Sequence, residues 1–245
     1  MTASARIPSV AMVLAAGLGK RMRPITETMP KPLVPIADKT LLDWGLDSLA
    51  DVGVARAVVN VHYLPDQIVD HVAQRRAPRI AISDERDGLL DSAGGIVKAL
   101  PQLGAEPFYI VNADTFWIDQ GTPNLARLAT VWDGARMDIL LMLASLDQAT
   151  GHSGSTDFLV APDGALSRAR GAPAGLIYAG AAIIHPRIFA GASTGPSSLN
   201  RYFDDAIATG RLFGMQMQGS WITVGTPDAI PQAEAAVKRA LADAS

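Results

Sequence analysis

The sequence contains no cysteine among its 245 residues. Disulfide bonds, thiolate zinc sites, iron–sulfur clusters and cysteine nucleophiles are therefore excluded. The four histidines are scattered, with no spacing that suggests a metal site. Long hydrophobic runs are lacking too, since Val10–Ala16 and Ile139–Ala144 fall far short of the roughly 18 residues of a membrane span. With no apolar signal-peptide core near Met1 either, we expect a cytoplasmic protein without a membrane partner.

An excess of charge of one sign is also lacking. The chain has 21 Lys and Arg against 24 Asp and Glu, which gives a formal net charge of −3. A chain with this balance is a poor candidate for bulk nucleic-acid binding, so we expect no nucleic-acid partner, although a local cationic pocket is compatible with it. The length and the 49% hydrophobic content fit one domain over residues 1–245.

The first 114 residues alternate between strand and helix patterns. Short apolar or β-branched runs predict strands at Val10–Ala16, Ala55–Val61, Arg79–Ser83 and Pro107–Val111, and helical spacing predicts helices at Leu41–Val52, Asp66–Ala73 and Gly95–Leu100. Alternation of this kind predicts an α/β protein whose parallel sheet has helices on both faces.

The pattern after residue 115 is less regular. We expect strands at Met137–Ala144, Phe158–Val160, Leu166–Arg168 and Ile177–Ile184, and helices at Pro123–Trp132, Ser198–Ala208 and Pro227–Ala242. Extended segments without helices between them predict an antiparallel addition to the same sheet. Thr226 is the expected N-cap of the last helix, with Pro227 at its first position.

A glycine turn follows the first predicted strand, and basic residues follow the turn. Gly17-Leu18-Gly19 precedes a set of cations: Lys20, Arg21, Arg23 and Lys31. Glycines allow backbone N–H groups to approach a phosphate, which cations neutralise. The spacing fits neither the dinucleotide fingerprint nor the P-loop. The prolines on either side of Lys31 predict an extended, stiff segment. From glycines and charges alone, a turn followed by a solvated basic loop explains the pattern slightly better.

The longer string LAAGLGKRMRPITETMPKPLVP, residues 14–35, resembles the signature of the sugar-1-phosphate nucleotidyltransferases. Asn112-Ala113-Asp114 and the Trp221…Gly225-Thr226-Pro227 segment stand where that family has its later motifs. The resemblance implies a single Rossmann-like nucleotidyltransferase domain with a mixed, mostly parallel sheet flanked by helices. Its nucleotide-binding half would span about residues 7–115 and its sugar-binding half about residues 116–245.

By this resemblance, the enzyme joins a sugar 1-phosphate to a nucleoside triphosphate and releases pyrophosphate. The implied catalytic residues are Arg21, Lys31 and Asp114, and Asp114 is the implied ligand of a Mg²⁺ cofactor. The implied nucleotide-binding residues are Leu14, Ala16, Gly17, Gly19, Lys20, Arg21, Glu85 and Gly94, where Gly94 and Gly95 let base and ribose lie close to the backbone. The implied sugar-binding residues are Asn112, Asp157, Gly180 and Asn200.

The sequence departs from the family at Thr223, where a second magnesium-binding aspartate is usual. Either Asp114, phosphates and water hold the ion alone, or activity is weakened, and a catalytically silent sugar-nucleotide sensor is the alternative from another class. The segment after Glu85 is similar to uridylyltransferases acting on N-acetylmuramate 1-phosphate. This favours UTP and that sugar in peptidoglycan recycling, over mannose- or heptose-1-phosphate guanylyltransferases and glucose-1-phosphate thymidylyltransferases. The oligomeric state stays open.

Overall fold

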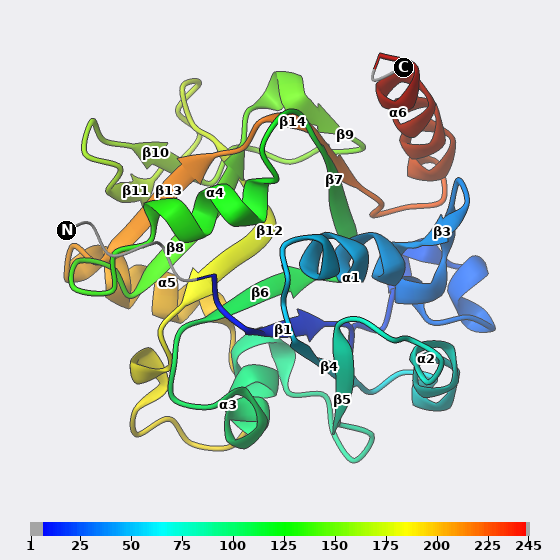
Figure 1. The fold of residues 1–245 in the computed structure, drawn as a ribbon. Helices are drawn as coiled ribbons and strands as arrows, with labels where there is room; N and C mark the ends of the chain where they lie inside the picture. The colour runs from blue at the N-terminus through cyan, green and yellow to red at the C-terminus, as the bar shows by residue number, and fades with distance from the viewer. Residues whose placement is uncertain (1–6, 244–245) are drawn as a thin grey trace.

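The computed structural model describes residues 7–243. A seven-stranded sheet runs through the middle of the molecule in the order β13-β8-β12-β6-β1-β4-β5 (Figure 1). The first part of the chain supplies four strands that run parallel: β1 (Val10–Leu14), β4 (Arg56–Val61), β5 (Arg79–Asp84) and β6 (Phe108–Asn112). Between them lie α1 (Leu41–Asp51), α2 (Pro65–Val72) and α3 (Asp91–Leu103). The predicted alternation of strand and helix is confirmed.

Helices cover both faces of this sheet. Successive side chains of a strand point to opposite faces. In β1, Ala11 and Val13 pack with α1, α2 and α4 (Asn124–Val131), whereas Met12 packs with α3 and α5 (Leu199–Ala208). Figure 1 accordingly shows α1 and α3 on opposite sides of β1. No helix within residues 7–243 combines the length and the apolar character that crossing a membrane requires.

The second part of the chain extends the sheet with antiparallel pairing. β12 (Ile177–Ile184) is antiparallel to both β6 and β8 (Ile139–Ala144), whereas β13 (Leu212–Gln216) pairs in parallel with β8 at the edge. The predicted antiparallel addition is therefore correct for β12. It is wrong for β10 (Phe158–Val160) and β11 (Leu166–Arg168), which form a two-stranded sheet of their own because β13 occupies the edge beside β8.

Two smaller sheets were not expected from the sequence. One joins β7 (Thr115–Asp119), β14 (Gly219–Thr223) and β9 (Ala149–Thr150), and the other is the pair β2 (Pro35–Ile36) and β3 (Lys39–Thr40). Pairing of β7 with β14 sets Thr223 opposite Thr115, next to the end of β6. α6 (Ala229–Asp243) begins later than predicted, because residues 226–228 form a turn in which Ala229 N donates to Thr226 O at 3.0 Å.

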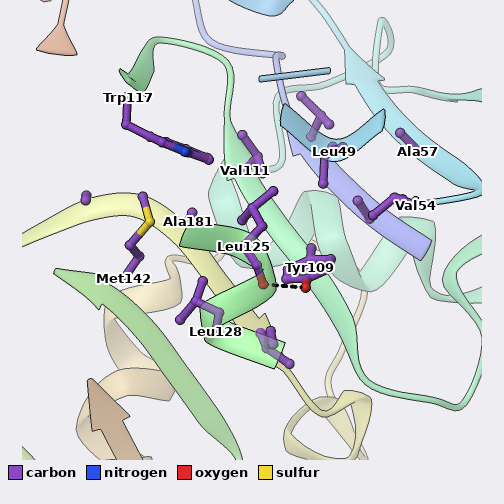
Figure 2. Packing of buried hydrophobic residues seen from close by; sticks show 14 of the residues in the cluster. Leu49, Val54, Ala57, Tyr109, Val111, Trp117, Leu125, Leu128, Met142 and Ala181 are labelled. Atoms are coloured by element: carbon purple, nitrogen blue, oxygen red, sulfur yellow. Dashed lines mark hydrogen bonds between the residues drawn. The ribbon is translucent and has the colours of Figure 1, made fainter. Parts of the chain in front are cut away.

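A hydrogen bond inside the core fixes β6 against α4. The Tyr109 hydroxyl donates to Leu125 O at 2.7 Å, among buried side chains that include Val111 and Leu128 (Figure 2). Burial raises the pKa of Tyr109, so the phenol stays a neutral donor. The strand that leads to Asn112 and Asp114 is thus held by both apolar packing and a satisfied polar group.

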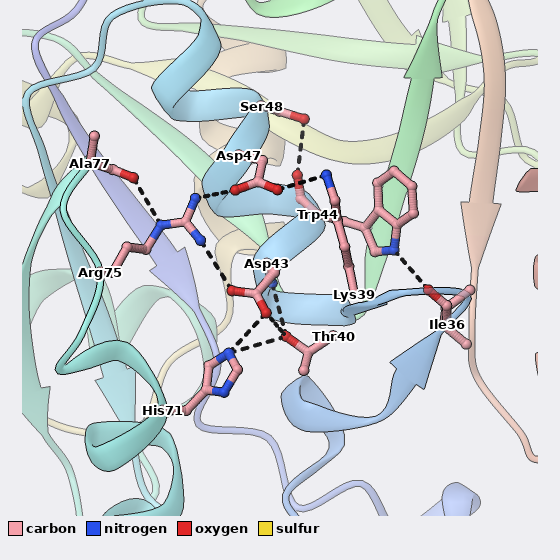
Figure 3. Close-up of polar contacts among 10 residues, drawn as sticks. All are labelled: Ile36, Lys39, Thr40, Asp43, Trp44, Asp47, Ser48, His71, Arg75 and Ala77. Atoms are coloured by element: carbon pink, nitrogen blue, oxygen red, sulfur yellow. Dashed lines mark hydrogen bonds and ion pairs between the residues drawn. The ribbon is translucent and has the colours of Figure 1, made fainter. Parts of the chain in front are cut away.

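Charged side chains fix the start of α1 against the segment that follows α2 (Figure 3). Thr40 is the N-cap and accepts from Asp43 N at 3.1 Å. Arg75 binds the carboxylates of Asp43 and Asp47, and Lys39 lies 2.8 Å from Asp47. Although burial raises the pKa of Asp47, hydrogen bonds from Lys39 and Arg75 outweigh it and the net shift is downward. This network closes the layer behind β1 and β4.

Candidate active site

A cavity of about 290 Å³ opens where β1 and β6 end. In an open α/β sheet, the carboxyl ends of parallel strands are the usual place for ligands. Leu14, Ala16 and Gly17 line the cavity from the end of β1, and Asn112 and Asp114 line it from the end of β6. Lys31 and Asn60 complete its polar lining together with Asp91 and Ser92. The structure thus gathers several of the predicted site residues around one space.

Lys31 and Asp114 form an ion pair on this cavity. Lys31 Nζ lies 2.7 Å from Asp114 Oδ2, and the two side chains are 10% and 43% exposed. Pro30 is extended, but Lys31 opens a single 3-10 turn over Lys31–Leu33, so the prediction of an extended segment is wrong there. The turn is closed by a hydrogen bond in which Leu33 N donates to Pro30 O at 2.9 Å. Proline lacks an N–H donor, but its carbonyl oxygen still accepts.

Gly19 explains how the glycine turn and the lysine come together. Its φ is +60°, and a Cβ atom placed there would lie 3.0 Å from both Lys31 Cβ and Thr26 Cγ2. Glycine adopts this conformation without strain and leaves room for the lysine stem. Gly19 therefore contributes by packing beneath Lys31, and is not itself on the cavity wall.

Glu85 lies inside the protein and holds two segments of the cavity. It is 1% exposed, and its Oε1 accepts from Asn60 Nδ2 at 2.7 Å while Oε2 accepts from Leu90 N at 3.3 Å. Asn60 Oδ1 in turn accepts from Ala15 N at 2.7 Å. Burial raises the pKa of Glu85 despite these hydrogen bonds. A chain of hydrogen bonds from Glu85 through Asn60 thus positions Ala15, and the contact of Glu85 with the nucleotide stays a prediction.

The space on Gly94 and Gly95 is filled by the protein itself. Both lie within α3, which starts at Asp91, four residues before the predicted helix. A Cβ on Gly94 would lie 2.3 Å from Gly195 O, and one on Gly95 would lie 2.6 Å from Glu85 Oε1. Ala93 N and Gly94 N donate to Ser197 O at 2.9 and 3.1 Å, which caps the helix. The protein thus occupies the side on which a Cβ would point, and a contact of base and ribose with the backbone of these glycines stays a prediction.

A second cavity, of about 260 Å³, adjoins the first and shares Leu14, Ser92 and Asn112 with it. Three of the predicted sugar-binding residues, Asn112, Asp157 and Asn200, line this second cavity. The fourth, Gly180, lies behind Asn112 at an irregularity of β12, with φ +79° and a Cβ position 3.3 Å from Asn112 Cβ. Gly180 therefore permits a close approach of β12 to β6.

Arg21 and Lys20 stand apart from these cavities. Both are exposed, on a 3-10 turn over Lys20–Met22. A Cβ on Gly225 would lie 3.5 Å from Arg21 Nη1, so the guanidinium lies beside the segment that follows β14. Val224 N donates to Asp114 O at 3.3 Å, which brings that same segment to the ion pair. Arg21, Thr223 and Asp114 thus lie where three segments meet: the 3-10 turn that carries Arg21, the end of β14, and the residues that follow β6.

The donor set near Asp114 fits a magnesium ion that is completed by substrate. Within residues 7–243, no group of three or more His, Cys, Asp or Glu side chains could hold a metal by itself. Mg²⁺ typically takes one or two carboxylates together with substrate phosphates and water. Asp114 offers one half-exposed carboxylate on the cavity, which satisfies that requirement at its lower limit.

Asn60 and Arg168 are polar residues of the two cavities that the sequence interpretation missed. Asn60 carries a detectable signal, because an amide within an apolar strand, AVVNV, is unusual. Arg168 ends the short strand β11 in a polar region and carries no such signal. Chemically, the two cavities combine an ammonium group, a carboxylate and backbone N–H groups, which together suit a phosphorylated ligand.

Comparison with known proteins gives consistent matches. The model of the MobA-like NTP transferase domain matches residues 11–145. N-acetylmuramate alpha-1-phosphate uridylyltransferase of Caulobacter vibrioides is 42% identical over 95% of this chain and 98% of its own. The protein of the same name from Neisseria meningitidis is 33% identical over 92% of this chain and 96% of its own.

Solved structures agree on the fold. The inositol-1-phosphate CTP transferase from T. maritima superposes with a TM-score of 0.76 at 18% identity, over 95% of this chain and 97% of that one. A UDP-glucose pyrophosphorylase complexed with UDP-glucose gives a TM-score of 0.75 at 18% identity, over 94% of this chain and 98% of that one. At these identities the likeness concerns the fold alone.

Proposed function

The chain belongs to the MobA-like NTP transferase family, and we propose that it transfers a uridylyl group from UTP to N-acetylmuramate 1-phosphate, giving UDP-N-acetylmuramate and pyrophosphate. The reaction class rests on one observation, the Lys31–Asp114 ion pair on a cavity at the carboxyl edge of the sheet. The choice of substrates is supported by the 42% identical relative, which is matched over nearly its whole length. Such an enzyme would serve peptidoglycan recycling in the cytoplasm.

The reaction needs charge neutralisation and alignment more than proton transfer. An oxygen of the sugar phosphate attacks the α-phosphorus of UTP, the new P–O bond forms, and the bond to the bridging oxygen breaks. The electron pair of that bond leaves with pyrophosphate. Catalysis of this kind comes from positioning and electrostatic stabilisation. The residues required are therefore fixed cations and N–H donors.

Lys31 supplies the central cation. An ammonium group has three donors, and one of them is directed at Asp114 at 2.7 Å. The other donors are able to contact oxygens of the α-phosphate and of the sugar phosphate, which draws two anions together. Ala16 and Gly17, which line the same cavity, would offer backbone N–H groups to the phosphates. Arg21 would neutralise the departing pyrophosphate, and Lys20 would add positive charge near the triphosphate.

Asp114 would hold a Mg²⁺ ion together with substrate phosphates and water, and the ion when bound supplies positive charge to the triphosphate. Thr223, at the end of β14, offers only a neutral hydroxyl beside the strand that follows Asp114. We therefore expect the metal to be recruited mainly with the nucleotide. Asn112, Asp157 and Asn200 would bind the sugar in the second cavity, with Gly180 shaping the wall behind Asn112.

Pyrophosphate release from a panel of substrates tests this function. UTP, dTTP, GTP and CTP are each combined with N-acetylmuramate, N-acetylglucosamine, mannose and glucose 1-phosphates, and kcat/KM is measured. We expect the highest value for UTP with N-acetylmuramate 1-phosphate. A preference for GTP with mannose 1-phosphate would overturn the substrates and keep the reaction class. No release with any pair, together with sugar-nucleotide binding, would indicate the sensor instead.

A further inference from the structure

A third cavity continues the path that starts at the Lys31–Asp114 pair. It shares Asp157, Arg168 and Asn200 with the second cavity, which itself shares Asn112 with the first. The three cavities therefore adjoin one another in series, starting at the proposed site of phosphate chemistry. A sugar whose phosphate lies at Lys31 would extend along this space toward Arg168.

The guanidinium of Arg168 is held in one orientation. Its Nε lies 2.8 Å from Asp204 Oδ1, and its Nη2 donates to Asn200 Oδ1 at 3.1 Å and to Asn200 O at 3.2 Å. Its Cζ lies 4.8 Å from the centre of the Phe158 ring. The side chain is 27% exposed. A planar cation fixed in this way is preorganised, so it loses little entropy when it binds a ligand.

One nitrogen of this guanidinium donates to no acceptor within the described residues. Among the side chains described, Nη1 makes no hydrogen bond, whereas Nε and Nη2 are both engaged. Arg170 lines the same third cavity, so two guanidinium groups offset the carboxylates of Asp157 and Asp204. The space can therefore accept an anion without net repulsion. Charge-assisted hydrogen bonds to a carboxylate are the strongest that arginine makes.

A second polar group on this path also has no acceptor. Tyr178 lines the second cavity, and its hydroxyl is buried without a hydrogen-bond partner within the described chain. Burial first, and then the charge of Asp114, raise the pKa of Tyr178, so it stays protonated and available as a donor. An orphaned buried hydroxyl is costly unless a ligand satisfies it. It supports a polar, oxygen-rich ligand between Lys31 and Arg168.

We propose that Arg168 binds the carboxylate of the lactyl ether of N-acetylmuramate 1-phosphate and thereby selects an acidic sugar over a neutral one. The proposal rests on the proposed function, and it adds the residue that sets sugar specificity. N-acetylmuramate differs from N-acetylglucosamine by a lactyl ether, and the carboxylate of that ether gives it its negative charge. Asp204 and Asn200 act as positioning residues for the guanidinium, while Asp157, whose Oδ2 accepts from Tyr178 N at 2.8 Å, is suited to hydroxyl or amide donors of the ring.

The test compares three sugar phosphates in the wild type and in Arg168→Leu. They are N-acetylmuramate 1-phosphate, its lactyl methyl ester and N-acetylglucosamine 1-phosphate. In the variant, kcat/KM for the acid should fall about 10- to 100-fold, the loss expected of a charge-assisted hydrogen bond. The values for the ester and for N-acetylglucosamine 1-phosphate should change less than about 3-fold on the same scale. The variant should thus no longer distinguish the acid from its ester.

Arg201→Leu is the matched control. Arg201 lies on α5, is 77% exposed and pairs only loosely with Asp205 at 3.9 Å. Its removal should leave all three values unchanged. An equal loss for all three sugars in Arg168→Leu would show that Arg168 only clamps β11 to α5, and would overturn the proposal.

The failure of the proposed function would look different. If the wild type converts none of the three sugars with any nucleotide, the activity is wrong. The specificity is then tested by calorimetric titration of the acid and its ester into both proteins without nucleotide. A preference for the acid that disappears in Arg168→Leu supports the proposal. Equal binding of acid and ester by the wild type contradicts it.

Discussion

Gly95→Ala should destabilise the protein even without any ligand. The added Cβ would lie 2.6 Å from Glu85 Oε1 and 2.7 Å from Asn60 Nδ2, inside any normal contact distance. Overpacking costs about 1–3 kcal/mol, and breaking a buried polar contact costs a further 1–3 kcal/mol or so. Alanine recovers roughly 1 kcal/mol of helix propensity. The net loss is about 3 kcal/mol, or roughly 6–12 °C in Tm for a chain of this length.

Thermal unfolding of the apo protein measures this loss, and UTP titration measures its consequence. Since Asn60 also accepts from Ala15 N, the KM for UTP should rise as well. Gly88→Ala is the control, because nothing lies within 4 Å of a Cβ at that position. If Gly95→Ala unfolds at the same temperature as Gly88→Ala and only the KM rises, the glycine faces the nucleotide and our interpretation of the Glu85 network is refuted.

Five further variants test the site and the Glu85 network. Lys31→Ala should lower kcat by about 10²–10³, the cost of losing one preorganised donor, and Lys31→Arg should restore it only in part; near-normal turnover would remove the lysine from the mechanism. Thr223→Asp should lower the Mg²⁺ concentration for half-maximal rate, and Asp114→Asn should nearly abolish activity; an unchanged magnesium titration in the first and an active second would place the metal elsewhere. Urea unfolding of Glu85→Gln should show a loss of stability relative to wild type that grows as the pH falls from 7 to 5. The raised pKa of Glu85 in the folded state lets folded wild type take up a proton at this carboxylate, which stabilises it, whereas glutamine does not titrate. A stability difference that does not change with pH would contradict this prediction.

The first half of the fold could be predicted because each strand is a short apolar run and each helix has a continuous apolar face. The later strands β13 and β14 were missed because LFGMQ and GSWIT mix glycine, polar and aromatic residues without a clear period. Their pairing depends on partners far along the chain, such as Thr115 for Thr223. Local sequence does not contain that information.

The candidate site likewise contains residues that the sequence identifies and residues that only the folded chain reveals. Lys31 and Asp114 could be identified from motifs, and the structure brings them into contact over 83 positions of the chain. The sequence does not reveal that the Glu85 carboxylate is buried against Asn60, 25 positions away, and its contact with the nucleotide stays a prediction. Arg168 escaped notice because its partners lie on α5, more than 30 positions later. Burial and distant polar partners are properties of the folded chain.

The central claim is tested most directly by phosphorus NMR of one reaction mixture containing the protein, UTP, N-acetylmuramate 1-phosphate and Mg²⁺. Uridylyl transfer predicts that the sugar-phosphate signal disappears while two signals of a sugar-linked diphosphate and one of free pyrophosphate appear in equimolar amounts. Formation of UMP with pyrophosphate while the sugar phosphate stays unchanged would contradict transfer to the sugar. Unchanged spectra in the presence of a folded protein would contradict catalysis itself.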